Sequence, residues 1–399
     1  MRILLLTSKV PYPPRDGGVI ATLSLAIALQ KLGNDITILS MNTAKHYCEI
    51  SQIPREFSDN INFKTFPLNT NIKLISLIKN FLFSKQPYVA ERFISKDFSD
   101  YLAKLLQAES FDIVQLEGLY LCPYIETIRK FSSAKIAFRS HNVEFEIWER
   151  KTKNEKNPII KIYFKNLTKR LKQFETSFIN RYDFLIPITE RDGNRFNQLG
   201  NKKAICVVQT GINTERYIIS ESESEFPGFF SIGTLDWLPN QEGLFWFIDN
   251  VWVKFAKKYP DAKFYIAGRN APKKLTGYFK NKNIVYLGEI EDANSFINSK
   301  SIMVVPLLSG SGMRIKIVEG MALGKTIITT TIGTEGIHTT HNENILIADS
   351  PNDFYNCLEL IYNNKEIHKK ISNNAKNFIY NNMNNYNIAE KLLKFYLEN

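Results

Sequence analysis

The 399-residue chain lacks the sequence features of several common protein classes. Its four cysteines are scattered along the chain and form no Cys-x-x-Cys pair. This pattern gives no disulfide framework and no zinc site, and it fits a reducing compartment. No apolar run approaches the roughly 20 residues that a membrane-spanning helix needs. The apolar start Met1–Thr7 is too short for a signal-peptide core, so we expect a first buried strand there.

Hydrophobic and aromatic residues are abundant, at 44% and 13% of the chain, which is ample for packed cores and argues against a disordered protein. A chain of this length favours two domains of roughly 150–200 residues. The polar, low-complexity segment Ser220–Glu225 indicates the boundary between them. We therefore expect domains at 1–215 and 216–380, with a last helix at about 381–399 that packs back on the first domain.

The net charge is +11, and basic residues concentrate in Lys151–Lys172, where Glu155 is the one acidic residue. Apolar residues alternate with these lysines at spacings that a helix sorts onto one face. A second stretch, Ile72–Lys85, also combines lysines with Leu, Ile and Phe. Three interpretations stay open: a solvated helix packed on its own domain, a surface for an anionic membrane, and a nucleic-acid site. We expect a cytoplasmic protein without a nucleic-acid partner, and a peripheral position at the inner face of the plasma membrane stays an option.

Short apolar runs alternate with amphipathic stretches along both halves of the chain, which predicts alternating strands and helices. The expected strands are Ile3–Leu6, Ile36–Leu39, Ile61–Phe66, Ile113–Leu116, Lys135–Phe138, Phe184–Ile188 and Ala204–Val208, then Phe229–Ile232, Lys263–Ala267, Ile284–Leu287, Ile302–Pro306, Thr326–Thr330 and Ile345–Ala348. The expected helices are Val19–Leu32, Ile72–Phe83, Asp97–Gln107, Pro123–Phe131 and Glu144–Asn180, then Asn240–Lys258, Ala293–Asn298, Met313–Leu323, Asn352–Tyr362, Lys365–Tyr380 and Asn387–Leu397. This order predicts an α/β protein in which each half has a doubly wound parallel sheet, with the two domains facing a central cleft.

One stretch of the second half, Ser301–Ile337, has the pattern of a phosphate-binding site. An apolar run ends at Pro306, a glycine-serine turn follows, and a helix is expected at Met313–Leu323. A strand, a glycine turn and a helix in this order leave free backbone N–H groups and the positive end of the helix dipole at one spot. Arg314 and Lys316 add two cations in the first turn, where they are unfavourable for an isolated helix. A bound anion explains this conflict, and a diphosphate is the obvious candidate.

Two further candidates lie in the first half. Gly17-Gly18 stands between the first strand and the first helix, where open α/β sheets bind ligands. The pair is not part of a Gly-x-Gly-x-x-Gly motif. It is therefore either an ordinary helix-starting turn or a flexible loop that lets a phosphate or a sugar approach the backbone. His141 follows the strand Lys135–Phe138, and this place at the carboxyl end of a parallel strand favours a functional role over a capping role.

Several short motifs follow one another in a fixed order. They are Gly17-Gly18, Ser140–Glu144 and Gly211–Asn213 in the first half, and Gly233–Asn240, Ile266–Arg269, Val285–Gly288 and above all Gly310–Gly324 in the second. In order and spacing they resemble the nucleotide-sugar-dependent glycosyltransferases of family four, over nearly the whole chain. The resemblance implies the GT-B fold, with an acceptor-binding Rossmann-like domain followed by a donor-binding one.

The resemblance also implies a contact to the donor's ribose. Members carry two glutamates separated by seven residues, and Glu319 matches the second, which accepts hydrogen bonds from the ribose hydroxyls. Ser311 stands at the position of the first glutamate, so a carboxylate contact to the transferred sugar is missing there. Lys316 and Glu319 are also three residues apart in one helix, so a surface ion pair is the alternative.

A basic pair that many members carry is missing as well, because Thr234 and Asn240 stand at its positions. Arg314 and Lys316 are the expected substitutes for its phosphate contacts, with Arg269 as a weaker third. The expected catalytic residues are His141, which would bond the transferred sugar, Arg314, Lys316 and Glu319. The expected donor-binding residues are Gly233, Thr234, Asn240, Arg269, Gly288, Ile290, Gly310, Ser311, Gly312 and Met313, and the expected glycine loop is Gly17 and Gly18.

The implied reaction is a retaining, metal-independent transfer of a sugar from a nucleotide-diphosphate sugar to an acceptor hydroxyl. No Asp-x-Asp occurs in the chain, so the carboxylate pair that holds a divalent cation in the other major transferase fold is missing, and we expect no metal or other cofactor. The expected acceptor is a saccharide or a lipid-linked molecule, in cell-envelope polysaccharide or lipopolysaccharide synthesis. A catalytically inactive GT-B binding module and a sugar-nucleotide epimerase stay as alternatives.

Overall fold

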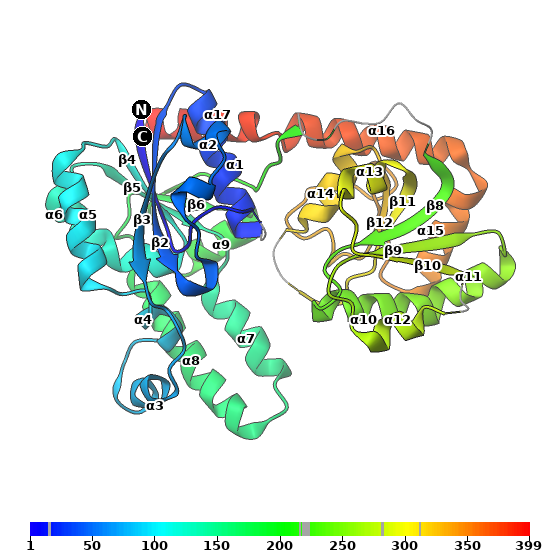
Figure 1. The fold of residues 1–399 in the computed structure, drawn as a ribbon, viewed down its shortest axis with the longest axis horizontal. Helices are drawn as coiled ribbons and strands as arrows, with labels where there is room; N and C mark the ends of the chain where they lie inside the picture. Colours follow the sequence, from blue (N-terminus) through cyan, green and yellow to red (C-terminus); the bar gives the residue numbers. More distant parts are fainter. Residues whose placement is uncertain (15–16, 215–216, 218–223, 281–282, 311–312) are drawn as a thin grey trace. The chain divides into compact units, whose positions relative to one another are not determined.

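In the computed structural model the described residues are 1–14, 17–214, 217, 224–280, 283–310 and 313–399 (Figure 1). They form two compact units, the first made of Met1–Gly211 with Ile388–Asn399 and the second of Ile212–Asn387. Each unit contains one parallel β-sheet covered by helices. Most of the polar segment Ser220–Glu225 lies outside the described residues.

The first unit is built on a seven-stranded sheet with the strand order β3-β2-β1-β4-β5-β6-β7. Its strands, all parallel, are β1 (Arg2–Thr7), β2 (Asp35–Thr43), β3 (Asn62–Leu68), β4 (Ile113–Glu117), β5 (Lys135–Ser140), β6 (Phe184–Pro187) and β7 (Ala204–Ile205). Along β1, Ile3 and Leu5 pack into one hydrophobic core, and Leu4 and Leu6 pack into another. This strand is therefore continuously apolar from Ile3 to Leu6, because both faces of the sheet are buried there.

Ten helices of the described residues belong wholly or in part to this unit. They are α1 (Gly17–Lys31), α2 (Arg55–Ser58), α3 (Leu74–Phe83), α4 (Tyr88–Glu91), α5 (Lys96–Ala108), α6 (Ile125–Phe131), α7 (Glu144–Asn154), α8 (Pro158–Ser177), α9 (Glu190–Gln198) and α17 (Asn385–Glu398). Ile388, Ala389 and Leu392 of α17 lie in the same core as Ile3 and Leu5. The last helix of the chain thus completes the first unit.

The single long helix expected at Glu144–Asn180 is wrong, because the chain forms a hairpin of two packed helices, α7 and α8, there (Figure 1). The second helix begins at Pro158, and the side chain of Asn157 caps it by accepting the N–H groups of Ile159 and Ile160. Proline suits the first helical position because the N–H group of a residue there has no acceptor within the helix. The Asn-Pro pair is the sequence signal that distinguishes this hairpin from one helix.

The second unit has a six-stranded parallel sheet with the order β10-β9-β8-β11-β12-β13. The strands are β8 (Glu225–Ile232), β9 (Lys263–Ala267), β10 (Ile284–Gly288), β11 (Lys300–Val305), β12 (Thr326–Thr329) and β13 (Leu346–Ile347). The helices are α10 (Leu238–Phe247), α11 (Val253–Lys258), α12 (Lys273–Tyr278), α13 (Ala293–Asn298), α14 (Ile315–Ala322), α15 (Pro351–Asn363) and α16 (Lys365–Asn382), and a π-helical turn at Ile248–Trp252 joins α10 to α11. Both units are doubly wound, which confirms the expected α/β class.

Candidate active site

The strand order of the second unit reverses at β8 and β11, which lie side by side. From β8 the sheet continues outward to β9 and β10, and from β11 it continues to β12 and β13. Open α/β sheets bind ligands beyond the carboxyl ends of the strands at such a reversal. Here that end is formed by the residues after β8, the residues after β11, and α14. We call the following set the α14 site: Gly233, Thr234, Trp237, Asn240, Gly310, Arg314, Lys316 and Glu319.

Lys316 lies in the first turn of α14 and reaches the end of β8. Its ammonium group donates to Oδ1 of Asn240 at 2.9 Å and lies 3.5 Å from the carbonyl oxygen of Ile232. The side-chain amide of Asn240 in turn donates to the carbonyl oxygen of Thr234 at 2.8 Å. Burial of the ammonium group, together with the nearby charge of Arg314, lowers the pKa of Lys316 to about 8. No carboxylate among the described residues forms an ion pair with this buried cation.

Arg314 stands at the N-cap of α14, because the helix begins at Ile315 and not, as expected, at Met313. Only 6% of Arg314 is exposed, and its guanidinium carbon lies 6.0 Å from the centre of the Trp237 ring. Gly310 leaves room for both groups. A Cβ atom at that position would come within 3.0 Å of Nη2 of Arg314 and 3.3 Å of the Trp237 ring, and its φ of +115° also favours glycine.

Glu319 lies further along α14 and accepts a hydrogen bond of 2.8 Å from the hydroxyl group of Tyr217. Burial raises the pKa of the Glu319 carboxyl, and the hydrogen bond from Tyr217 offsets part of this rise. Lys316 and Glu319 contact different partners, and no ion pair joins them within the described ranges. The alternative of a surface ion pair between them is therefore not what the structure contains.

The residues after β9 contact both the residues after β8 and the end of β10. A Cβ atom at Gly268 would lie 1.9 Å from the carbonyl oxygen of Gly233, so the segments that follow β8 and β9 touch. The carbonyl oxygen of Gly288 accepts the N–H group of Gly268 at 2.8 Å. Arg269 accepts the N–H group of Leu235 at 2.9 Å through its own carbonyl oxygen, and its side chain is exposed.

The remaining predicted donor-binding residues are less informative. Ile290 follows β10 and is half-buried, and Met313 is half-buried against the core that contains Ile317 and Met321. Ser311 and Gly312 lie outside the described residues. The structure thus brings Gly233, Thr234, Asn240 and Lys316 together, and their roles in binding stay predictions.

His141 belongs to the first unit, where the strand order reverses at β1 and β4. It follows β5, and its Nε2 atom lies 2.8 Å from Oε2 of Glu117, the last residue of β4. Only 2% of the Glu117 side chain is exposed, against 18% of that of His141. Glu117 is not among the residues predicted from the sequence, although an acidic residue that closes a mostly apolar run such as Ile113–Leu116 is a signal for a polar group at a strand's carboxyl end.

Glu117 is the centre of a buried polar cluster. Its Oε2 atom lies 3.0 Å from the hydroxyl group of Thr22 and 3.5 Å from Nη1 of Arg139, and its Oε1 atom accepts the side-chain amide of Gln115. Burial alone would raise the pKa of this carboxyl. The Arg139 charge and the hydrogen bonds from His141 and Gln115 outweigh burial and lower the pKa to about 2. The group that faces His141 is therefore a carboxylate at neutral pH.

A helix-starting turn and a flexible ligand-binding loop are the two alternatives for Gly17 and Gly18, and in the structure the pair forms the start of α1. The hydroxyl group of Thr22 lies 3.0 Å from the carbonyl oxygen of Gly18 as well as 3.0 Å from Glu117. The first turn of α1 is therefore at the same edge of the sheet as His141. A Cβ atom at Gly17 would meet no heavy atom within 4 Å, so the fold itself does not require glycine there.

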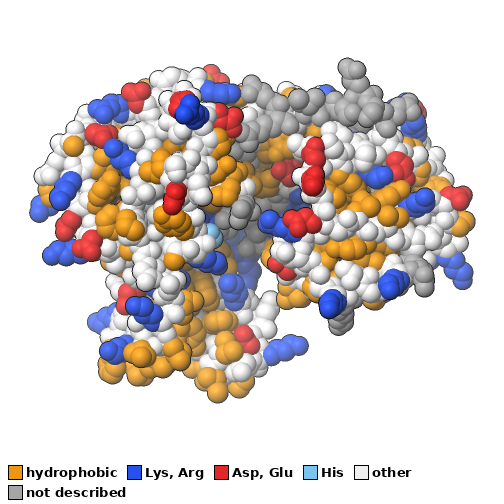
Figure 2. All heavy atoms as spheres, viewed as in Figure 1, with side chains coloured by type: hydrophobic (Ala, Val, Ile, Leu, Met, Phe, Trp, Pro, Cys, Tyr) orange, Lys and Arg blue, Asp and Glu red, His pale blue; other side chains and the backbone are white. Residues whose placement is uncertain are grey.

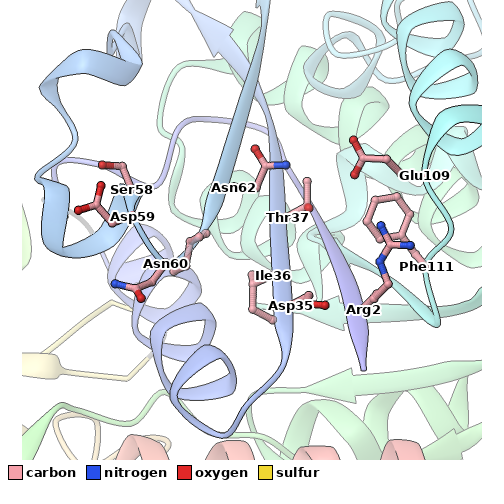
Figure 3. Close-up of a pocket in the computed structure, with 11 residues that line it drawn as sticks. Arg2, Asp35, Ile36, Thr37, Ser58, Asp59, Asn60, Asn62, Glu109 and Phe111 are labelled. Carbon is pink, nitrogen blue, oxygen red and sulfur yellow. The ribbon is translucent and has the colours of Figure 1, made fainter.

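A groove of about 430 Å³ lies at the opposite edge of the first sheet (Figure 3). It is lined by residues at the amino ends of β1, β2 and β3 and before β4: Arg2, Asp35, Ile36, Thr37, Ser58, Asp59, Asn60, Ile61, Asn62, Glu109 and Phe111. Arg2 occupies one side of it, with its guanidinium carbon 5.7 Å from the centre of the Phe111 ring. Because ligands of open α/β sheets bind at the carboxyl ends of strands, we do not assign this groove to the active site.

The four cysteines are buried and form no disulfide. Across the described ranges, no three or more His, Cys, Asp or Glu side chains gather where they could hold a metal ion. A helix with the length and apolar character to cross a membrane is not found in those ranges either.

Several known proteins are similar to this chain. Residues 227–364 match the family described as Glycosyl transferases group 1. The chain is 22% identical to an uncharacterized 44.6 kDa protein in the cps region of Klebsiella pneumoniae, over 98% of this chain and 99% of the relative. It is 30% identical to an uncharacterized glycosyltransferase of Methanocaldococcus jannaschii, over 49% of this chain and 54% of the relative. Among solved structures, HepE of Anabaena in complex with UDP has a TM-score of 0.70 at 12% identity with 100% of both chains covered, and its complex with UDP-glucose has a TM-score of 0.66.

These matches define the class of protein. The matched segment contains every residue of the α14 site, so this site lies in a group 1 glycosyltransferase domain. The likeness to HepE over the full length shows the GT-B fold. The domain and the fold together make the protein a GT-B glycosyltransferase.

Proposed function

We propose that the protein is a retaining, metal-independent glycosyltransferase of family four, which moves a sugar from a nucleotide-diphosphate sugar to an acceptor hydroxyl. The donor would bind at the α14 site. The match of residues 227–364 to group 1 glycosyltransferases supports this placement. So do the complexes of HepE with UDP and UDP-glucose, a protein of the same fold.

The observation that carries the proposal is the buried cation at the start of α14. The ammonium group of Lys316 is held by two oxygen atoms of neutral groups, Oδ1 of Asn240 and the carbonyl oxygen of Ile232. The Arg314 guanidinium and the positive end of the α14 dipole lie near this ammonium group. Burying like charges together is unfavourable. A diphosphate would offset this cost by accepting charge-assisted hydrogen bonds from both side chains and from the helix N–H groups.

Glu319 suits the ribose of the donor. A carboxylate accepts hydrogen bonds from two vicinal hydroxyl groups without a change in its own geometry. The hydrogen bond from the Tyr217 hydroxyl supports this role, because it is the same kind of donor at 2.8 Å. In the proposed complex the ribose hydroxyls would share or replace that contact.

The cations also explain a reaction without a metal ion. As the bond between the sugar and the diphosphate breaks, negative charge grows on the leaving phosphate oxygen. In the proposed mechanism Arg314, Lys316 and the N–H groups of α14 would stabilise this charge, and little reorganisation would be needed during the reaction. In the retaining mechanism of the family, the acceptor attacks from the same face as the leaving group, and the departing phosphate oxygen takes the acceptor's proton. No enzymic base is then needed at the α14 site.

His141 would hydrogen-bond a hydroxyl group of the transferred sugar. Because Glu117 is a carboxylate at neutral pH, the nitrogen that faces it, Nε2, carries the proton and donates. In the neutral imidazole the other ring nitrogen, Nδ1, is then the acceptor. Glu117 would thus fix both the orientation and the tautomer of the imidazole.

The acceptor is proposed to be a saccharide or a lipid-linked saccharide of cell-envelope polysaccharide or lipopolysaccharide synthesis. The relative from the cps region of Klebsiella pneumoniae supports this role, because it matches this chain over nearly its full length.

A donor screen tests the proposal. Purified protein is mixed with nucleoside diphosphates and nucleotide sugars of different bases, and both the unfolding temperature and nucleoside diphosphate release are measured. A ligand at one hundred times its Kd stabilises the folded state by about 2.7 kcal/mol, which raises the Tm by several degrees. The expected result is such a rise for one base, and its loss in Lys316→Met.

Lys370→Met is the matched control, because Lys370 is an exposed lysine on α16 of the same unit. It should keep the full rise in Tm. If no nucleotide or nucleotide sugar raises the Tm of the wild-type protein, the donor site is not where we place it. If binding occurs without release of nucleoside diphosphate in the presence of acceptor extracts, the protein is a binding module.

A further inference from the structure

One end of the first unit exposes an unusual set of large hydrophobic side chains. They lie in and just before α3 and in the first turns of α8, and Phe83, Ile159 and Ile75 are 84%, 78% and 71% exposed. Figure 2 shows hydrophobic side chains gathered at the lower end of this unit, with Lys and Arg side chains among them. Single exposed hydrophobic residues are normal on a protein surface, but a contiguous group marks an interaction site. We call this set the apolar tip: Ile72, Leu74, Ile75, Ile78, Leu82, Phe83, Ile159, Ile160 and Ile162.

Positively charged side chains flank the residues of the apolar tip in the sequence. Six exposed lysines flank it in sequence: Lys73, Lys79, Lys85, Lys151, Lys153 and Lys156. The two stretches that contain the tip, Ile72–Lys85 and Lys151–Lys172, hold one acidic residue between them, Glu155. Within the described ranges none of the six ammonium groups forms an ion pair with a carboxylate. This surface therefore combines apolar area with an excess of positive charge.

The apolar tip is held in place by the opposite face of α3. Arg170 of α8 donates to the carbonyl oxygens of Asn80 at 2.9 Å and of Phe81 at 2.8 Å. The ring of Phe81 packs on that of Tyr163, with 5.8 Å between their centres. The hydroxyl group of Tyr88 accepts the N–H group of Lys73, the residue just before α3. The fold thus uses the face of α3 that carries Asn80 and Phe81 for packing, and it leaves the large apolar residues Leu74, Ile75, Ile78, Leu82 and Phe83 toward solvent.

We propose that the apolar tip and its six lysines dock on the surface of an anionic phospholipid bilayer. In such a contact the apolar side chains lie below the lipid headgroups, and the ammonium groups meet the lipid phosphates. Lysine suits this position because its apolar stem can follow the tip while its charged end reaches the phosphate. The contact needs no membrane-spanning segment.

Two other occupants fit this surface less well. A second copy of the chain, related by a two-fold axis, would place the tip against the same tip and the lysines against the same lysines, which repel each other. A nucleic acid would use the positive charge, but it would leave the isoleucine, leucine and phenylalanine side chains without an apolar partner.

Vesicle sedimentation with the full chain tests the proposal, and it requires neither donor nor activity. The probes are vesicles of phosphatidylcholine alone and vesicles with about one third phosphatidylglycerol. We expect at least about tenfold tighter binding to the anionic vesicles, and weaker binding at high salt because the charges are then screened.

Two variants separate the contributions of charge and of apolar area. Lys73→Gln with Lys79→Gln should weaken binding to the anionic vesicles about tenfold or more. Ile75→Gln with Phe83→Gln keeps the charge and should weaken binding by a similar factor. Glutamine is a good helix former, and all four positions are exposed, so the variants should fold like the wild type.

The matched controls are Lys257→Gln with Lys370→Gln, two exposed lysines of the second unit, and Leu397→Gln, a leucine of α17 that is 68% exposed. These should bind vesicles like the wild-type protein. The proposal is overturned if the protein binds neither type of vesicle, or if the tip variants bind as tightly as the controls. It is also overturned if Ile75→Gln with Phe83→Gln turns a dimer into a monomer in sedimentation velocity, because the tip would then be an interface between copies.

Discussion

The ammonium group of Lys316 lies 2.9 Å from Oδ1 of Asn240, which joins the first turn of α14 to α10 beside the end of β8. The two residues are 76 positions apart in the sequence. The family resemblance implies a basic residue at the position where Asn240 stands. Here α14 supplies the cation instead, and the amide of Asn240 holds it.

This arrangement predicts a pH dependence of donor binding. Burial lowers the pKa of Lys316 to about 8, so in the free protein the side chain loses its proton as the pH rises through this value. Only the protonated form attracts a diphosphate, and the affinity for the nucleoside diphosphate found in the screen should therefore fall about tenfold between about pH 7 and pH 9.5. Calorimetric titration across this range checks the prediction. Lys316→Met should bind weakly and show no such fall, and a flat wild-type profile would contradict the assigned role.

Arg314→Ala and Glu319→Ala should each lower the rate of sugar transfer at least about tenfold, because each removes a charge-assisted contact to the donor. Unchanged kcat/KM values in both variants would remove the site assignment.

A donor with a 2′-deoxyribose tests the contact of Glu319 separately. The wild-type enzyme should use this donor about tenfold less well, because one hydroxyl group no longer reaches the carboxylate. In Glu319→Ala the two donors should have nearly equal kcat/KM values. If the loss from the substitution and the loss from the deoxy donor simply multiply, Glu319 does not bind that hydroxyl group.

Glu117→Gln should destabilise the protein by about 3–5 kcal/mol, because the substitution leaves the buried Arg139 without its carboxylate. The pKa of Glu117 is about 2 in the folded state, below its ordinary value of 4.5. The unfolded chain therefore binds the extra proton first as the pH falls below about 4.5, and stability is lost toward about pH 2. Urea unfolding at several pH values measures both effects.

Glu109→Gln serves as the control for this experiment, since Glu109 forms a surface ion pair with Lys64. It should change the free energy of unfolding by about 1 kcal/mol or less. Equal effects of the two substitutions would show that the cluster around Glu117 is not a buried charge network.

Gly243→Ala should destabilise the second unit by about 1–3 kcal/mol, although alanine usually stabilises a helix. Gly243 lies in α10, and its Cβ atom would come within 2.1 Å of the carbonyl oxygen of Pro306. Gly277→Ala in α12 is the matched control, because no heavy atom lies within 4 Å of its Cβ position, and it should stabilise by about 0.5–1 kcal/mol. Thermal unfolding of both variants checks the pair, and stabilisation by both would contradict the close packing of α10 on the end of β11.

Much of the fold could be predicted because its signals are local. A run such as Ile3–Leu6 is apolar on both sides of the strand, and this fits a parallel sheet covered on both faces. The stretch that begins at Ser301 predicts a strand, a turn and a helix, and the structure has β11 and α14 there, with the helix start shifted from Met313 to Ile315. The hairpin of α7 and α8 was not predicted, because the helical periodicity of the apolar residues around Pro158 outweighed the local signal of this proline.

The site could be predicted only in part. Arg314 and Lys316 carried a local signal, because cations at the start of a helix conflict with its dipole. Glu117 carried a weaker signal, an acidic residue at the end of a strand, and its meaning depends on the 2.8 Å contact with His141, which follows a different strand. The partner of Lys316 was also beyond prediction, because side chains on two helices meet only after the strand order has been set.

The sequence by itself determined the alternation of strands and helices, the parallel character of both sheets, and the order of the motifs along the chain. Only the tertiary structure decided which side chains meet at the ends of the strands and which face of α3 is left toward solvent. The reason is physical. The periodicity of apolar residues is fixed by near neighbours in the chain, whereas contacts between distant residues depend on the strand order that packing selects.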